Sequence, residues 1–263
     1  MGSEVGIRDR IYCSITGFGQ DGPYAARAGY DYIIQGMSGL MSVTGDPDGQ
    51  PQKVGVAVTD IFTGLYASNA ILAAVHQRQV TERGQHIDLA LLDVAVATTA
   101  NQAMNYLATG KSPERLGNAH PNIVPYQVFE CGDGHVIIAV GNDGQFRKFC
   151  SVLGLDALGT DPRFATNPAR LENRSVLVPL LADKMLDWTK ADILTTCETK
   201  GVPAGPINTF EDVFADPQVI ARGLKLDIDG ALSVRPPMRF SDADLALDRP
   251  APSLGQDQDI IDA

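Results

Sequence analysis

The stretch Gly55-Val-Ala-Val-Thr-Asp60-Ile-Phe-Thr-Gly64-Leu-Tyr-Ala-Ser-Asn-Ala-Ile-Leu-Ala-Ala74 joins a short apolar run, one carboxylate and a long run of small and apolar residues. It predicts a buried strand over 54–58 and a helix over 61–78, with Asp60 at the junction. The first N–H groups of a helix lack intrahelical partners and its dipole is positive there, so we expect Asp60 to cap the helix and to be held ionised. Such a carboxylate can also attack an electrophile. Capping is the commoner role for such an aspartate, so the surrounding sequence has to decide between capping and nucleophilic attack.

The rest of the first half alternates between strand-like and helix-like segments. Residues 11–15 are typical of a buried strand, and 86–90 are compatible with either a strand or the start of a helix. The apolar spacing over 30–41 and 91–109 is helical, with a stop at Gly110. This alternation predicts an α/β fold.

A stretch rich in Pro, Gly, Asn and His, 113–125, separates this half from a second set of elements. Strand-like segments at 126–130 and 135–140 flank a Cys-Gly-Asp-Gly turn. Helical segments follow at 143–154 and 173–200, the second carrying Trp188. The chain is therefore expected to divide into an α/β domain with Asp60 (1–112), a linker loop and small α+β domain (113–205), and a C-terminal return segment packing on the first domain (206–263).

Charge and composition restrict the partners and the compartment. The 263 residues carry a formal net charge of −11, which argues against nucleic acid and anionic membranes as partners. No run of eighteen apolar residues predicts a membrane span, and no apolar segment near the N-terminus predicts a secretory signal. The four cysteines form no Cys-x-x-Cys pair, and the four histidines have no metal-ligand spacing. We expect a cytoplasmic protein with reduced thiols and no metal site.

Several motifs, in one order along the chain, resemble those of the family III CoA-transferases (CaiB/BaiF type). They are Ile15-Thr-Gly-Phe-Gly-Gln-Asp-Gly-Pro-Tyr24, Ala28-Gly-Tyr-Asp31, Thr59-Asp-Ile-Phe-Thr-Gly64, Arg83-Gly-Gln-His-Ile-Asp-Leu-Ala-Leu-Leu-Asp93, Gly117-Asn-Ala-His-Pro-Asn-Ile-Val-Pro-Tyr126, Gly201-Val-Pro-Ala-Gly-Pro-Ile-Asn208, Asp216-Pro-Gln218 and Ala251-Pro-Ser-Leu-Gly-Gln256. Together they span almost the whole chain. The chain resembles most the branch that moves CoA between dicarboxylates such as succinate and glutarate.

The resemblance implies that Asp60 is the nucleophile. It would attack an acyl-CoA thioester to give a mixed anhydride and then an aspartyl-CoA thioester, which an acceptor carboxylate would take over. The substrates would be an acyl-CoA and a small carboxylate or dicarboxylate, with no tightly bound cofactor. N–H groups at 61–63 are expected to stabilise the developing oxyanions.

The resemblance also implies an architecture and further site residues. It implies a Rossmann-like large domain, incomplete at its N-terminus, a small α+β domain and an interlocked homodimer. Arg27 and Tyr30 are expected to contact CoA. The family's glycine-rich loop falls near Gly117–Pro121, where Asn118 and His120 replace family glycines, so Gly117, Asn118 and His120 are further candidates. A second substrate carboxylate would need a cation, for which Arg115 and Arg27 are candidates.

Two alternatives remain open. The racemases of α-methylacyl-CoA share this fold and pair the aspartate with a histidine in a Gly-His-Asp segment. This chain has Gly29-Tyr30-Asp31 there, and a tyrosine hydroxyl is a poor base at neutral pH, which favours the transferase. Members of the family begin with a segment that supplies CoA contacts and has no counterpart here. The other alternative is therefore a truncated, non-catalytic relative that binds a partner chain.

Overall fold

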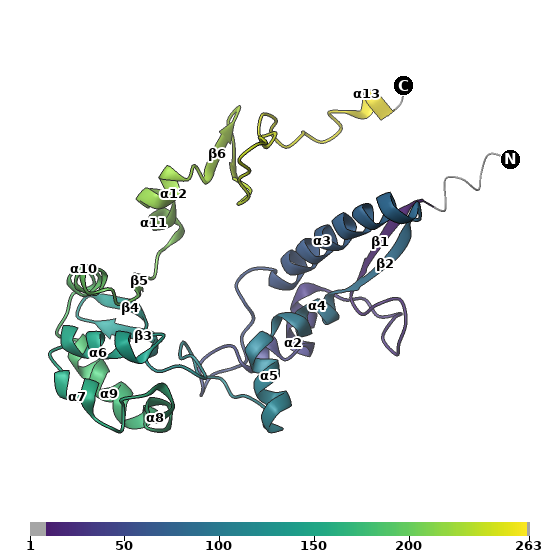
Figure 1. The fold of residues 1–263 in the computed structure, drawn as a ribbon. Helices are drawn as coiled ribbons and strands as arrows, with labels where there is room; N and C mark the ends of the chain where they lie inside the picture. The colour runs from purple at the N-terminus through teal and green to yellow at the C-terminus, as the bar shows by residue number, and fades with distance from the viewer. Residues whose placement is uncertain (1–8, 262–263) are drawn as a thin grey trace.

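The computed structural model describes residues 9–261, which form an N-terminal part, a small unit and a C-terminal arm (Figure 1). In the N-terminal part, β1 and β2 form a parallel pair whose register runs from Ile11 opposite Gln85 to Thr16 opposite Ala90. The crossover between them passes through the long helix α3. The elements of this part are β1 (Ile11–Thr16), α2 (Asp31–Met37), the 3-10 helix η1 (Leu40–Ser42), α3 (Val58–Thr81), β2 (Gln85–Ala90), α4 (Leu91–Thr98) and α5 (Ala100–Thr109).

Local signals explain most of these elements, and tertiary contacts explain the exceptions. The strand predicted at 11–15 is β1, and the helical region 91–109 ends at the left-handed Gly110 as expected, although it is divided into α4 and α5. The strand predicted at 54–58 is wrong, because 54–57 are loop and α3 begins at Val58. The backbone N–H of Val54 donates to the side-chain Oε1 of Gln35 at 2.9 Å and not to a neighbouring strand.

Helix α3 turns small residues toward the protein and large apolar residues toward solvent. Its buried residues are Thr59, Thr63, Ala67 and Ala74. Its exposed large apolar residues are Ile61, Phe62, Leu65, Tyr66, Ile71, Leu72 and Val80. Among residues 9–261, α3 is the one helix that is long and apolar enough, by length and composition, to cross a membrane, although it contains no uninterrupted run of eighteen apolar residues. Length and composition alone are weak evidence for a span, since core helices pass the same test.

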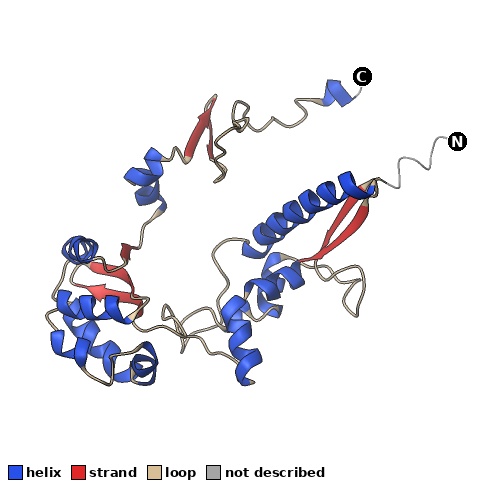
Figure 2. Ribbon diagram, viewed as in Figure 1, coloured by secondary structure: helices blue, strands red, loops and turns tan. Residues whose placement is uncertain are grey.

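The small unit holds the main hydrophobic core of the described residues. Its antiparallel sheet has the order β3-β4-β5, and helices cover it (Figure 2). Phe129, Val136, Phe146, Phe149 and Leu181 are among the side chains of this core. The elements are β3 (Tyr126–Cys131), β4 (Gly134–Ala139), α6 (Asp143–Val152), α7 (Asp156–Thr160), α8 (Asn167–Glu172), α9 (Arg174–Met185), α10 (Lys190–Lys200) and β5 (Ala204–Pro206).

The single helix predicted over 173–200 is two helices. Helix α9 ends at Met185 and α10 begins at Lys190, so Trp188 lies in the connection and not on a helix. The hydroxyl of Thr189 accepts a hydrogen bond from the backbone N–H of Asp192 and caps α10. A threonine at this place satisfies an unpaired N–H at the start of α10, which favours a new helix there over continuation of α9.

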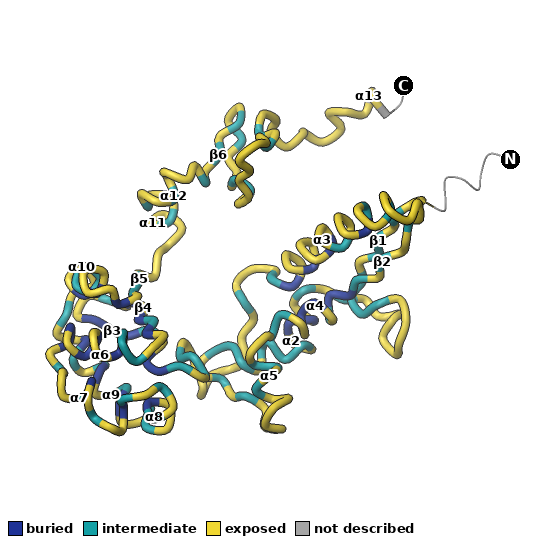
Figure 3. The backbone as a smooth tube through the Cα atoms, in the orientation of Figure 1, coloured by how far each residue is buried: buried dark blue, intermediate teal, exposed yellow. Residues whose placement is uncertain are grey.

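The C-terminal arm leaves the small unit after β5 and stands away from α3 and the β1–β2 pair (Figure 1). It contains α11 (Phe210–Ala215), α12 (Pro217–Ala221), β6 (Lys225–Ile228), β7 (Ala231–Val234) and α13 (Gln258–Ile261). Among the described side chains, none beyond Val202 is buried (Figure 3). Short helices and a lone hairpin have little stability of their own in water, so these elements need a covering surface.

Candidate functional site

The first turn of α3 lies at the end of the parallel strands where ligands bind in α/β folds. Strands β1 and β2 point the same way, and α3 returns between them in sequence, so its N-terminus lies toward their carboxyl ends (Figure 1). In open α/β sheets this is the edge at which ligand sites form. Asp60 lies in that first turn and is exposed, and no hydrogen bond or ion pair with another described residue engages its carboxylate.

Asp60 does not cap α3, which corrects the sequence expectation. The helix is flanked by Ala57, and Asp60 is its third residue. The capping acceptor comes from Asp31, whose Oδ1 accepts a hydrogen bond from the backbone N–H of Thr59 at 2.8 Å, across 28 residues of sequence. The N–H of Thr59 is thus satisfied without the Asp60 carboxylate, which stays exposed.

The prediction that N–H groups at 61–63 are free to stabilise an oxyanion is also wrong. The N–H of Ile61 donates to the carbonyl of Ala57 at 3.1 Å, and the N–H groups that follow lie within the helix, where they are paired. The N–H of Val58 donates to the carbonyl of Val56 at 2.8 Å. Among the described residues, the first-turn N–H left without a partner is that of Asp60 itself.

A close approach of two glycines places Asp31 and Tyr30 beside this turn. A Cβ on Gly17 would lie 2.5 Å from the Cα of Gly29, closer than real side chains come, so the loop after β1 can close only with glycine at both positions. Helix α2 begins two residues after Gly29. Tyr30 is 72% exposed and adjoins Asp31, so the structure brings it to the start of α3.

Arg27 lies in the same loop, with its guanidinium 3.8 Å from the centre of the Tyr24 ring. The loop is exposed and Arg27 makes no ion pair with a described residue. An exposed guanidinium held over an aromatic ring keeps its outward N–H groups available to an anion.

The other candidate residues gather on a different loop. The N–H of Gly117, whose φ is +57°, donates to the carbonyl of Gly45 at 3.1 Å, which fixes this loop to the turn at 45–49. Asn118 follows in an exposed turn. No hydrogen bond or ion pair within 9–261 joins Gly117, Asn118 or His120 to Asp60.

His120 is held by its own loop and by the small unit. Its Nδ1 accepts a hydrogen bond from the N–H of Asn122 at 3.0 Å, and its carbonyl accepts one from Arg174. Burial, with a smaller contribution from the charge of Arg174, lowers the pKa of His120 below its ordinary value. A neutral ring is therefore favoured at this position at neutral pH.

Arg115 braces the turn that Gly117 contacts. Its Nε donates to the carbonyl of Asp46 at 3.1 Å and its Nη2 to the carbonyl of Gly49 at 2.9 Å. These bonds use much of its donor capacity, whereas the guanidinium of Arg27 makes no ion pair with a described residue.

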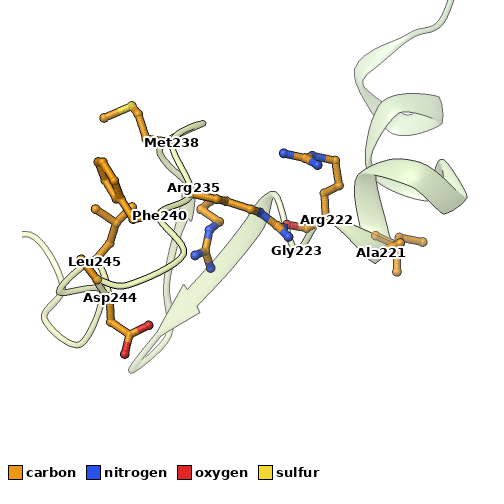
Figure 4. Close-up of a pocket in the computed structure, with 11 residues that line it drawn as sticks. Ala221, Arg222, Gly223, Arg235, Met238, Phe240, Asp244 and Leu245 are labelled. Atoms are coloured by element: carbon orange, nitrogen blue, oxygen red, sulfur yellow. The ribbon is translucent and has the colours of Figure 1, made fainter.

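A cavity of about 330 Å³ lies on the C-terminal arm and away from Asp60 (Figure 4). Three of its lining residues are Arg222, Arg235 and Arg239, and the Nε of Arg235 is buried without a hydrogen-bond partner. No motif or spacing in the sequence indicated this cavity. The described part of the chain contains no group of three or more His, Cys, Asp or Glu residues that could hold a metal ion.

Comparison with known proteins connects this geometry to one family. The sequence model of CoA-transferase family III matches residues 9–258. The succinate–glutarate CoA-transferase of Agrobacterium fabrum is 57% identical over 253 residues, which are 94% of this chain and 63% of that protein. The human succinyl-CoA:glutarate CoA-transferase is 43% identical over 251 residues, 94% of this chain and 57% of its own length. The chain thus spans less than two thirds of these curated relatives.

A solved structure shows the same fold. The crystal structure of a CaiB/BaiF family protein from Brucella suis is 57% identical and superposes with a TM-score of 0.83. The match covers 97% of this chain and 68% of that one. A second match is Rv3272 from Mycobacterium tuberculosis, with a TM-score of 0.83 at 25% identity.

Proposed function

This chain belongs to CoA-transferase family III, and on that premise we propose that it moves coenzyme A from an acyl-CoA thioester to a free carboxylate with Asp60 as the nucleophile. The observation that carries the proposal is the Asp60 carboxylate, exposed and unpaired at the start of α3 while Asp31 provides the cap. A carboxylate without competing hydrogen bonds keeps its lone pairs available for attack.

The proposed reaction balances without a cofactor or a net proton transfer. An Asp60 oxygen attacks the thioester carbonyl and the C–S bond breaks. This forms a mixed anhydride between Asp60 and the donor acid and releases CoA as a thiolate. The thiolate then attacks the Asp60 carbonyl carbon, which releases the donor carboxylate and forms an aspartyl-CoA thioester. An acceptor carboxylate reverses these two steps, so each activated acyl bond is exchanged for another. The N–H of Asp60, which has no partner among the described residues, is a candidate donor for a developing oxyanion.

We propose small dicarboxylates as the acids, because the relatives are named for succinate and glutarate. Arg27 is the candidate cation for a substrate carboxylate or a CoA phosphate, and Tyr30 is the candidate contact beside the nucleophile. The loop with Gly117, Asn118 and His120 is the candidate for shielding the intermediates, although no direct bond joins it to Asp60 in the described chain. Tyr30, where the racemases have a histidine, favours transfer over proton abstraction.

We further propose a cytoplasmic homodimer in which the chains interlock. Two observations support an assembly: the exposed apolar face of α3, and an arm with no buried side chain beyond Val202 among the described residues. Exposed apolar surfaces of this extent on a folded chain commonly mark contacts with other protein. In this proposal residues 1–112 and 113–205 form the large and small domains, and 206–263 pack on a large domain.

A trapping experiment tests the nucleophile. The protein is incubated with succinyl-CoA and hydroxylamine, and its peptides are examined by mass spectrometry. Hydroxylamine converts an aspartyl anhydride or thioester into a stable hydroxamate, which is expected at Asp60 and to be absent after Asp60→Ala. Glutarate should compete with the trapping. Asp216→Ala, which removes an aspartate that caps a helix of the arm, serves as the matched control and should still give the Asp60 adduct. A hydroxamate elsewhere, or none, refutes the proposal.

A further inference from the structure

We infer that Asp31 and Gln35 are positioning residues that fix the start of α3 and thereby aim Asp60; the inference rests on the proposed function. The two residues form one chain of hydrogen bonds that holds the loop at Val54 and the helix at Thr59. Asp60 lies directly after the second of these points.

The chain of hydrogen bonds is short and directional. The Oε1 of Gln35 accepts from the N–H of Val54 at 2.9 Å, and its Nε2 donates to Oδ2 of Asp31 at 2.7 Å. Oδ1 of Asp31 then accepts from the N–H of Thr59 at 2.8 Å. Gln35 is fully buried and Thr59 is 2% exposed, so these two ends of the chain are shielded from water, while Asp31 between them is half-buried.

The polarity of each group in this chain is imposed by its neighbour. The N–H of Val54 can only donate, so Gln35 must turn its oxygen toward it and its NH₂ toward residue 31. Residue 31 must therefore accept from Gln35 with one terminal atom and from Thr59 with the other, which a carboxylate does and an amide cannot. The geometry calls for aspartate at 31, because asparagine would turn its NH₂ group toward one of two donors, either the NH₂ of Gln35 or the N–H of Thr59.

The carboxylates of Asp31 and Asp60 differ in their hydrogen bonding. Both oxygens of Asp31 are engaged by donors, whereas no described residue engages those of Asp60. Asp31 thus holds the backbone and Asp60 is left to react. A displacement of the α3 start by about 1 Å would move Asp60 relative to a bound thioester, and a misplacement of that size can lower a rate by about 100-fold.

Reversal of the hydrogen-bond polarity provides the test. Asp31→Asn sets two donors against each other and should lower kcat for transfer from succinyl-CoA to glutarate by about 10- to 100-fold, with KM changed much less. The double variant Asp31→Asn/Gln35→Glu restores the three bonds of this chain, because the carboxylate introduced at position 35 can accept both from the new amide at position 31 and from the N–H of Val54, while the amide oxygen at 31 accepts from Thr59. It loses only the long 3.5 Å bond from Nε2 of Gln35 to the carbonyl of Val56. Most of the lost kcat should return.

The controls separate positioning from folding. Asp216→Asn makes the same change at an aspartate that caps α12 and should leave kcat unchanged. Wild-type kcat in Asp31→Asn, or a double variant no faster than the single one, would overturn the inference. If the wild-type protein itself shows no transfer and no Asp60 adduct, that result would instead refute the proposed function.

Amide hydrogen exchange measures the same network without any need for turnover. Asp31→Ala should speed exchange at Thr59 and in the segment 54–60, and Asp31→Asn/Gln35→Glu should keep the wild-type rate. The amides that Asp216 caps, at Gln218 and Val219, should be unaffected in all of these variants. Unchanged exchange at Thr59 in Asp31→Ala would show that Asp31 does not hold the start of α3.

Discussion

The buried guanidinium of Arg170 makes the stability of the small unit sensitive to a single substitution. Its side chain is fully buried and donates to the carbonyl of Val124 at 2.6 Å and to that of Phe164 at 2.9 Å. Its third bond is to Oδ1 of Asp143 at 2.9 Å, and the guanidinium lies 4.5 Å from the centre of the Phe146 ring. One side chain therefore connects the entry to β3, the loop before α8 and the start of α6.

Arg170→Met retains an unbranched apolar stem and removes every donor. Each buried carbonyl left without its partner costs about 1–3 kcal/mol. Asp143 is 43% exposed and can be hydrated, so its freed charge adds little. Together these give a loss of about 3–5 kcal/mol in the free energy of unfolding, as for other buried pairs that lose one partner. With a urea m-value of about 2 kcal/mol/M, the midpoint should fall by about 2 M.

Trp188 makes the measurement specific to this unit. It is the one tryptophan of the chain and packs against the core of the small unit, so its fluorescence in urea follows the unfolding of that core. Arg163→Met is the matched control, because Arg163 pairs with Asp161 at 2.7 Å but is 60% exposed. Arg163→Met should lower the urea midpoint much less, and this difference should disappear at high salt. A midpoint for Arg170→Met equal to that of the control would refute this reasoning.

Three further predictions concern other parts of the chain. Burial raises the pKa of Cys150 to about 12 and that of Cys197 to about 11, so at pH 8 both should resist iodoacetamide in the native protein and react in urea; native labelling of either would contradict their burial. Folding lowers the pKa of His120, so its contribution to stability is full above its ordinary value of 6.5 and is lost as the pH falls through the lower folded pKa; His120→Asn should flatten the stability curve in that window, and an unchanged curve would contradict the shift. Gly17→Ala would place its Cβ 2.5 Å from the Cα of Gly29 and should lower both Tm and transfer activity, whereas Gly205→Ala, at a glycine without a left-handed φ whose added Cβ meets no atom within 4 Å, should cost less; equal effects would show that the close approach is unimportant.

Segments whose structure depends on nearby residues could be predicted from the sequence. The strand at 11–15, the hairpin around the Cys-Gly-Asp-Gly turn and the stop at Gly110 follow from apolar periodicity and turn chemistry. The order of the motifs likewise identified the family, because a motif is recognised by residue identity and spacing along the chain and needs no tertiary contact. Asp60 was located at the start of α3 for the same reason.

Predictions that required knowledge of distant partners were wrong. Residues 54–58 have the composition of a strand, but the groups that meet their backbone come from Gln35 and not from a strand. Asp60 has the position of a cap, but Asp31 takes that role from 28 residues away. Neither contact leaves a periodic signal in the sequence, since both depend on how α2 lies against the start of α3.

The sequence by itself determined the family, the α/β character and the aspartate at the start of the long helix. Only the tertiary structure decided that this aspartate is free, because two carboxylates converge on one helix terminus and the backbone N–H of Thr59 is bound by Asp31. The physical reason is that the acceptor for the N–H of Thr59 comes from α2 through a part-buried chain of hydrogen bonds, so the carboxylate of Asp60, the third residue of α3, is not used in that bond and stays exposed.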